Sequence, residues 1–94
     1  FNDLLCHAFL QALQEFGKQC PRDIRVVGYD NEDFSKYAIP ALTTIDEDYA
    51  LQSKMVVDLL LEKIMHPERE MKGCFATVTP ELIIRNSTKN GGWQ

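Results

Sequence analysis

The sequence predicts an α/β fold in which a parallel sheet is flanked by helices. Three observations support this prediction: an amphipathic pattern over residues 4–16, a polar connection over 18–23, and an apolar run over 24–27 that stops at Gly28. The run contains two adjacent valines and is typical of a strand buried on both faces, as in parallel sheets. The order helix, loop, strand is the repeating unit of α/β proteins.

The charge balance and hydropathy argue against a DNA-binding module, a membrane-spanning protein and a secreted protein. Lys and Arg together number 10 and Asp and Glu 14, so the 94-residue chain has a net charge of −4. DNA-binding modules carry a basic balance, so we do not expect this chain itself to contact DNA. The sequence shows neither the roughly 18 apolar residues that span a bilayer nor the features of a signal peptide, and we expect a soluble, cytoplasmic protein.

The cysteines and histidines show no metal-ligand or disulfide pattern. Cys6, Cys20 and Cys74 are odd in number and widely spaced, and we interpret them as free thiols in a reducing cytoplasm. His7 and His66 have no second ligand at helical or hairpin spacing. We therefore expect no metal and no cofactor.

The first helix is predicted over residues 4–16, where apolar side chains recur at the spacing of one helix face. Asn2 or Asp3 is a suitable N-cap, because either side chain can accept a hydrogen bond from a first-turn amide. Gly17 suits the left-handed position that follows a helix. One helix start does not need both an amide and an acid, so the cap explains only one of the two residues.

The strand ends suggest a ligand site. Asp30 follows the apolar run, and if Phe1 ends a preceding strand, Asn2 also lies at the carboxyl end of a strand. In open α/β sheets, small molecules bind in the crevice outside these ends. We therefore hypothesise that Asn2 and Asp30 flank one ligand-binding crevice, with capping and turn formation as their alternative roles.

Residues 31–40 have no clean period and are predicted to form a loop or a short helical turn. This segment carries Phe34 and Tyr37, which indicate either a contact surface or burial against the first helix. Residues 42–45 are short and β-prone.

The second long helix is predicted to begin among Asp46, Glu47 and Asp48, whose charges suit the positive end of a helix dipole, and to end at Pro67. Its wide apolar face consists of Leu51, Met55, Val56, Leu59, Leu60, Ile64 and Met65. Strands are predicted over residues 74–78 and 81–85, followed by a polar tail.

Several stretches together resemble the last third of LacI/GalR-type bacterial transcriptional regulators. They are Asn2-Asp3, the helix that ends at Gly17, Pro21-Arg22-Asp23-Ile24, Val26-Val27-Gly28-Tyr29-Asp30-Asn31, Pro40-Ala41-Leu42-Thr43-Thr44-Ile45, and Pro80-Glu81-Leu82-Ile83-Ile84-Arg85-Asn86-Ser87-Thr88. The resemblance covers nearly the whole chain, in order and without gaps.

The resemblance implies a C-terminal fragment of a periplasmic-binding-protein-like, type I, two-lobed fold. The implied assignments are the second lobe over residues 1–40 and 81–88, the first lobe over 46–77, and a tail over 89–94. The chain would cross between lobes near 42–45 and 78–80. A DNA-binding head and most of the first lobe would be absent from this chain.

The resemblance also implies an effector-sensing and dimerisation role within a DNA-binding regulator. A sugar, sugar derivative or nucleobase would bind Asn2 and Asp30 in the inter-lobe cleft and change operator affinity allosterically. Phe9, Phe34 and Tyr37 would contribute to a homodimer contact. Operator DNA would be contacted through a separate N-terminal domain, and no membrane would be involved.

Other classes of protein remain as alternatives. A periplasmic sugar-binding protein of a transport system would share the fold and the cleft, but its precursor would carry a signal peptide. An enzyme with Asp3 and Asp30 as an acid/base pair is disfavoured, because Asp3 has a capping role and the sequence shows no nucleophile or metal constellation. We therefore expect no catalysis. A free-standing interaction module would have to be stable at this length, whereas we expect exposed helix faces to drive association.

Overall fold

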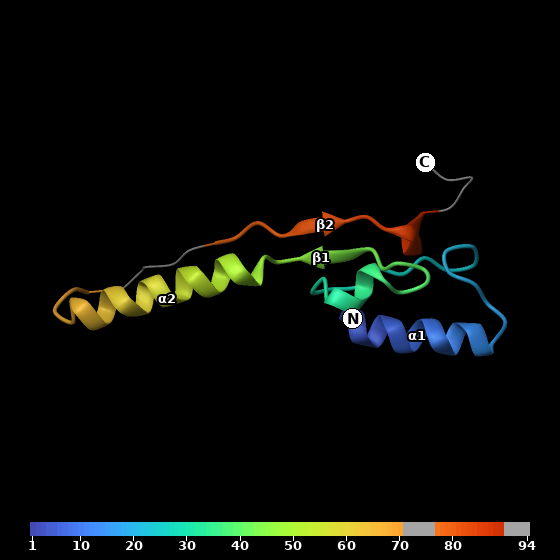
Figure 1. The fold of residues 1–94 in the computed structure, drawn as a ribbon, viewed down its shortest axis with the longest axis horizontal. Helices are drawn as coiled ribbons and strands as arrows, with labels where there is room; N and C mark the ends of the chain where they lie inside the picture. Colours follow the sequence, from blue (N-terminus) through green and yellow to red (C-terminus); the bar gives the residue numbers. More distant parts are fainter. Residues whose placement is uncertain (71–76, 90–94) are drawn as a thin grey trace. The chain divides into compact units, whose positions relative to one another are not determined.

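The computed structural model describes residues 1–70 and 77–89. The chain divides into two compact units (Figure 1). Unit 1 consists of Phe1–Asp46 together with Glu81–Gln94, and unit 2 consists of Glu47–Pro80. The chain therefore leaves unit 1 once, after Asp46, and returns to it at Glu81.

Helix α1 spans Asp3–Glu15 and confirms the first predicted helix. Its N-cap is Asn2, whose side-chain oxygen accepts a hydrogen bond from the Leu5 amide at 2.9 Å. Gly17 has a φ of +72° just beyond the helix, a conformation that glycine adopts without a Cβ clash.

The apolar run over residues 24–27 is not a strand buried on both faces, and this part of the prediction is wrong. Val26 is buried, but Ile24 is exposed and Val27 retains 47% of its exposure. The parallel pairing of the run is a single bridge between Val27 and Thr43. Parallel strands become buried when other elements cover both faces, and among the described residues the run lacks that cover.

The buried core of unit 1 is small and centres on Cys6, Val26 and Leu42. Its partly buried neighbours are Phe9, Leu10, Cys20, Phe34 and Ala38. Two 3₁₀ helices complete the unit: η1 over Asp33–Lys36, which agrees with the predicted helical turn, and η2 over Asn86–Thr88.

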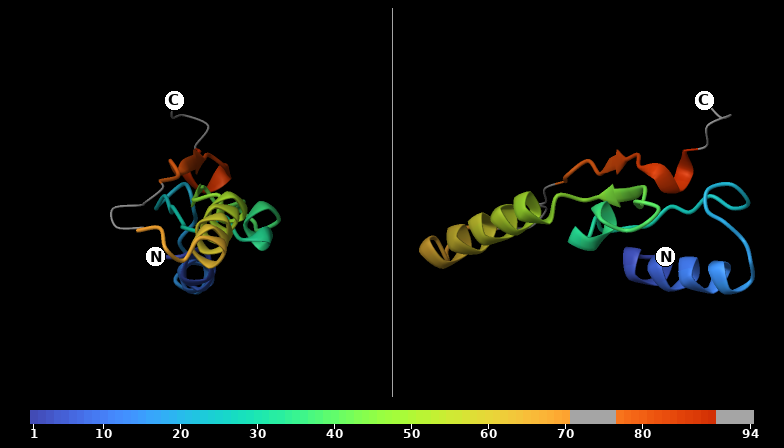
Figure 2. Two further views of the ribbon diagram at one scale, coloured as in Figure 1. Left: turned by 90° about the vertical axis from the view of Figure 1, so that its left-hand side faces the viewer. Right: turned by 45° about the vertical axis from the view of Figure 1, so that its right-hand side comes forward.

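Strands β1 (Thr44–Asp46) and β2 (Glu81–Ile83) form an antiparallel pair, side by side in Figures 1 and 2. Thr44 pairs with Ile83, and Asp46 pairs with Glu81. Both strands were predicted close to these positions. Because unit 1 ends at Asp46 and resumes at Glu81, the pair lies where the chain leaves and re-enters this unit.

In unit 2, helix α2 spans Tyr49–Met65 and confirms the second predicted helix. The Asp48 carboxylate caps its start by accepting a hydrogen bond from the Leu51 amide at 3.2 Å. No residue of α2 is buried, and Met65 is 72% exposed. A groove of about 320 Å³ runs along the helix, lined by Gln52, Met55, Val56, Leu59, Thr77 and Val78. The predicted apolar face therefore lacks cover within the described part of unit 2.

The predicted strand over residues 74–78 falls mostly outside the described residues, as do Cys74 and residues 90–94 of the predicted tail. Thr77 and Val78 are described, and they are not in a strand. Among the helices that the structure describes, none is long and apolar enough to cross a membrane.

Candidate functional site

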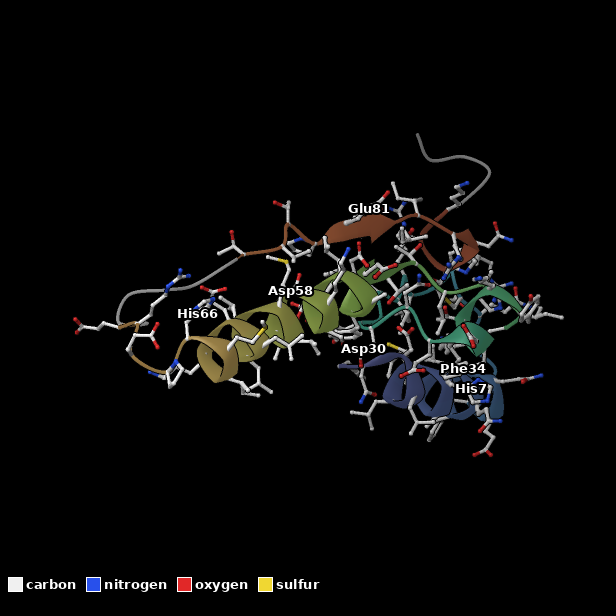
Figure 3. The ribbon with its side chains drawn as sticks, turned by 60° about the vertical axis from the view of Figure 1, so that its left-hand side comes forward. His7, Asp30, Phe34, Asp58, His66 and Glu81 are labelled. Carbon is white, nitrogen blue, oxygen red and sulfur yellow. The ribbon has the colours of Figure 1, made fainter. Side chains whose placement is uncertain are left out.

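The N-terminus of α1 meets the end of the apolar run through a backbone hydrogen bond. The amide of Asp3 donates to the carbonyl of Tyr29 at 3.0 Å. Asn2 precedes one of these residues and Asp30 follows the other, so the two candidate ligand residues lie on either side of this contact. Asn2 is exposed and Asp30 is half-buried, with Asp30 labelled in Figure 3. The cap uses the oxygen of the Asn2 amide, and its nitrogen is not part of the cap.

Asp3 does not cap the helix, and the structure corrects that alternative. Its carboxylate is fully buried, with Oδ1 accepting from the Thr44 hydroxyl at 2.7 Å and Oδ2 accepting from the Glu32 amide at 2.8 Å. A Cβ added at Gly28 would overlap Oδ1. Asp3 therefore fastens the turn after Gly28 to the helix and to β1, and it is unsuited to acid/base work at an open site.

The turn at Asp30 and Asn31 has an unusual backbone. Both residues have positive φ angles, +111° at Asp30 and +54° at Asn31. Their amides donate to the Ile45 carbonyl at 2.9 Å and to the Thr44 hydroxyl at 3.2 Å, respectively. Non-glycine residues in this region are strained and cluster at binding sites. Hydrogen bonds to residues 44 and 45 thus hold the turn in this conformation.

The side chain of Asn31 lies at the centre of a hydrogen-bond network, the Asn31 network, which consists of Asn31, Ser35, Asp46 and Arg85. Its oxygen accepts from the Arg85 guanidinium at 2.8 Å, and its nitrogen donates to Asp46 Oδ2 at 3.0 Å. The same guanidinium donates to the Ser35 hydroxyl at 2.8 Å and to the Leu42 carbonyl at 3.0 Å. A guanidinium only donates, so Arg85 fixes which end of the amide faces Asp46.

Sequence reasoning did not assign Asn31, Ser35 or Arg85 to the site, and it gave Asp3 the wrong role. The partners of the Arg85 guanidinium lie 43 to 54 residues away along the chain, so local patterns carry little information about them. Gly28 was the one local indication of the buried Asp3 contact, because a glycine between a valine and a tyrosine suggests that another group approaches the backbone closely.

The three candidate dimer residues differ in their exposure. Phe9 and Phe34 are half-buried against the core, whereas Tyr37 is 80% exposed. The rings of His7 and Phe34 meet edge to face, with centroids 5.8 Å apart (Figure 3). A groove of about 290 Å³ on this face is lined by Leu4, His7, Phe34, Tyr37 and Ala38. Phe9 does not line this groove, and the dimer contact of the three residues stays a prediction.

The thiols and carboxylates form no metal cluster in the described part of the chain. Cys6 and Cys20 are free thiols, whose sulfurs donate to the Val27 and Ser87 carbonyls at 3.4 and 3.3 Å. Burial raises the pKa of both thiols, and the carboxylate of Asp3 raises that of Cys6 further. Both groups are therefore protonated at neutral pH and poor nucleophiles.

Residues 1–88 match the family model of the periplasmic binding protein-like domain. The chain belongs to this family. The α/β fold class of a periplasmic binding protein-like domain is thus confirmed, as is the resemblance to LacI/GalR-type regulators. The chain spans about a quarter of the length of the curated relatives that it matches.

Three relatives illustrate the similarity of this periplasmic binding protein-like domain to known proteins. The transcriptional repressor PurR of Photobacterium profundum is 34% identical over 96% of this chain and 26% of its own length. A LacI family regulator from Enterococcus faecium with bound ribose is 33% identical, with a TM-score of 0.82 over 94% of this chain and 32% of that one. The lac repressor dimer bound to operator and the anti-inducer ONPF gives 34% identity and a TM-score of 0.80, over 93% of this chain and 26% of that one.

Proposed function

We propose that this chain is the effector-sensing and dimerisation part of a cytoplasmic, DNA-binding transcriptional regulator. A small molecule, namely a sugar, a sugar derivative or a nucleobase, binds at Asn2 and Asp30 and changes operator affinity allosterically. The regulator acts as a homodimer, contacts operator DNA through residues outside this chain, and is not an enzyme. The relatives support this proposal, since they are named as repressors and regulators and one of them holds ribose.

The observation that carries the proposal is the strained turn beside the helix N-terminus. The hydrogen bond between the Asp3 amide and the Tyr29 carbonyl brings Asn2 and Asp30 to the same end of the fold. The Asp30 carboxylate can accept hydrogen bonds from hydroxyl or ring N–H groups, and the nitrogen of the Asn2 amide can donate one. A carboxylate and an amide together suit a polar ligand with several donors and acceptors.

The allosteric step requires the effector to bind two states of the protein unequally. A ligand shifts an equilibrium only by its difference in affinity for the two states. In a dimeric regulator, the paired DNA-binding heads must match a fixed half-site spacing, so a small shift in subunit arrangement alters operator affinity.

The first test is the mass and N-terminal sequence of the native gene product. A much longer chain that opens with a basic helix-turn-helix supports the regulator. A cleaved signal peptide would instead indicate a periplasmic sugar-binding protein of a transport system, and a product of about 94 residues would contradict both assignments.

The second test is Asp30→Ala in the native gene product. Operator affinity is measured, on a site selected from a random DNA pool, with and without ribose, adenine, guanine or hypoxanthine. We expect the wild type to respond to one of these probes, and the variant to lose that response while it still binds the operator. The exposed Asp33, also an acid but located in η1, provides the matched control as Asp33→Ala. An unchanged response in Asp30→Ala would remove Asp30 from the site.

A further inference from the structure

The Asn31 network joins the strained turn to β1, where the chain leaves unit 1, and to the segment after β2, where the chain has re-entered it. Asp46, the acceptor of the Asn31 amide nitrogen, is the last residue of β1 and of the first stretch of unit 1. Arg85, the donor to the Asn31 oxygen, lies two residues after β2, on the segment that re-enters unit 1 at Glu81. One amide therefore contacts both connections, and it directly follows Asp30 in the chain.

The Arg85 guanidinium determines the orientation of the Asn31 side-chain amide. Arg85 can only donate, so the Asn31 oxygen must face it and the nitrogen must face Asp46. The guanidinium is itself held by the Ser35 hydroxyl and the Leu42 carbonyl. A displacement of the turn at Asp30 and Asn31 would therefore strain hydrogen bonds to β1 and to the segment after β2 together.

We propose that Asn31 is a positioning residue that transmits occupancy at Asp30 to the two connecting segments, through its hydrogen bonds to Asp46 at the end of β1 and to Arg85 just after β2. This inference rests on the proposed function, because it names the route by which effector binding reaches the connections between units. Asn31 need not touch the effector. Its contribution is to make the turn and the strand pair move as one element, so that a ligand that biases the turn also biases the strand pair.

The test exchanges the polarity of one hydrogen bond in the native gene product. Asn31→Asp keeps the oxygen that Arg85 requires but places a second carboxylate oxygen against Asp46. We expect the ratio of operator affinities with and without the responding probe, among ribose, adenine, guanine and hypoxanthine, to fall at least tenfold toward unity. Combining Asn31→Asp with Asp46→Asn restores a donor and an acceptor in reversed order, and we expect it to recover most of the response.

Two further variants keep the test decisive if Asn31→Asp does not fold. Asp46→Asn alone retains an oxygen that can accept from Asn31, so it should keep the response, whereas Asp46→Ala should lose it. Asn86→Asp makes the same chemical change at an exposed asparagine of η2 and is the matched control. A response that survives in Asn31→Asp and Asp46→Ala, or that the exchanged pair fails to recover, overturns the proposal.

Amide hydrogen exchange tests the role of Asn31 independently of the proposed function. In the absence of any probe, Asn31→Asp should make the amides of β1 and β2 exchange several-fold faster, and the exchanged pair should restore their protection. If the wild type responds to none of the probes, the proposed function fails, yet the exchange rates still decide whether Asn31 holds the strand pair. Unchanged exchange in Asn31→Asp would refute the link directly.

Discussion

The side chain of Asp3 lies directly against the backbone of Gly28. The buried carboxylate occupies the space that a side chain at position 28 would need, and it is fixed there by the Thr44 hydroxyl and the Glu32 amide. The carboxylate cannot move away easily, because the buried Thr44 hydroxyl would then lose its hydrogen-bond acceptor. The identity of residue 28 is thus set by a side chain 25 positions earlier in the chain.

This fit makes Gly28→Ala destabilising. We expect a loss of about 1–3 kcal/mol in the free energy of unfolding, the usual range for overpacking, measured by chemical denaturation of the native gene product. The loss should shrink when Gly28→Ala is introduced into an Asp3→Ala background, because the overlapping atom is then absent.

Gly17 provides the control for this substitution. An added Cβ at Gly17 meets no atom within 4 Å, although the φ of +72° is unfavourable for most residues. Asparagine tolerates this conformation, so Gly17→Asn should cost little. Equal losses at both positions would indicate that steric overlap with Asp3 is not the cause.

The buried thiols predict a decline in stability at alkaline pH. Burial raises the pKa of Cys6 and Cys20 above the ordinary value of 9.0. As pH rises through 9.0, the unfolded chain releases these protons while the folded chain retains them, so the free energy of unfolding falls. Denaturation of the wild type and of a Cys6→Ala, Cys20→Ala variant between pH 8 and 11 should show a steeper decline in the wild type. Parallel curves would exclude the thiols as the cause.

At the scale of elements, the sequence predicted the two long helices, because local periodicity determines them. Helices α1 and α2 follow from apolar spacing and from capping residues within a few positions, so both were predicted to within about two residues of their ends. The burial of the 24–27 run depends on Thr43 and Ser87, which lie 16 and 61 residues away from their partners Val27 and Val26. The role of Asp3 depends on Glu32 and Thr44, which are also distant along the chain. No local pattern specifies these contacts. The ligand-binding roles of Asn2 and Asp30 stay predictions, and the hydrogen bonds of Asp3 and Asn31 were not predicted because their partners lie far away along the chain.

The N-cap of α1 allows the two roles of Asn2 to be separated. Asn2→Asp keeps an oxygen for the Leu5 amide but removes the amide nitrogen, whereas Asn2→Ala removes both groups. We expect Asn2→Ala to lose about 1 kcal/mol of stability and Asn2→Asp to lose almost none. Both should weaken binding of the responding probe in isothermal titration. Full affinity in Asn2→Asp would limit Asn2 to capping.

At the scale of the whole molecule, the apolar surface of unit 1 is the candidate contact of the proposed homodimer. Tyr37 is 80% exposed and borders the groove that also contains His7 and Phe34. Replacing Tyr37 with glutamate would bury a charge in that contact, so we expect Tyr37→Glu to weaken the dimer at least tenfold in sedimentation equilibrium. Phe16→Glu is the matched control, because Phe16 is 81% exposed but does not line the groove. An unchanged dimer in Tyr37→Glu would exclude this face.

The 94-residue chain by itself should associate. Helix α2 has no buried residue, and its apolar side chains would remain in contact with water at a cost of about 25 cal/mol per Å². We expect sedimentation velocity to show species larger than the 10.8 kDa monomer. A compact monomer that melts cooperatively would contradict this prediction.

The pairing of Asp46 with Glu81 has a consequence for protein engineering. The two ends of the intervening 47–80 segment meet at one pair of opposed residues in an antiparallel ladder. Such a pair is the natural position for a hairpin, which an Asn-Gly dipeptide can close in a type I′ turn. Residues 47–80 can therefore be deleted and replaced by two residues without a change in the path of the chain through unit 1. The same segment can also be exchanged for that of a relative.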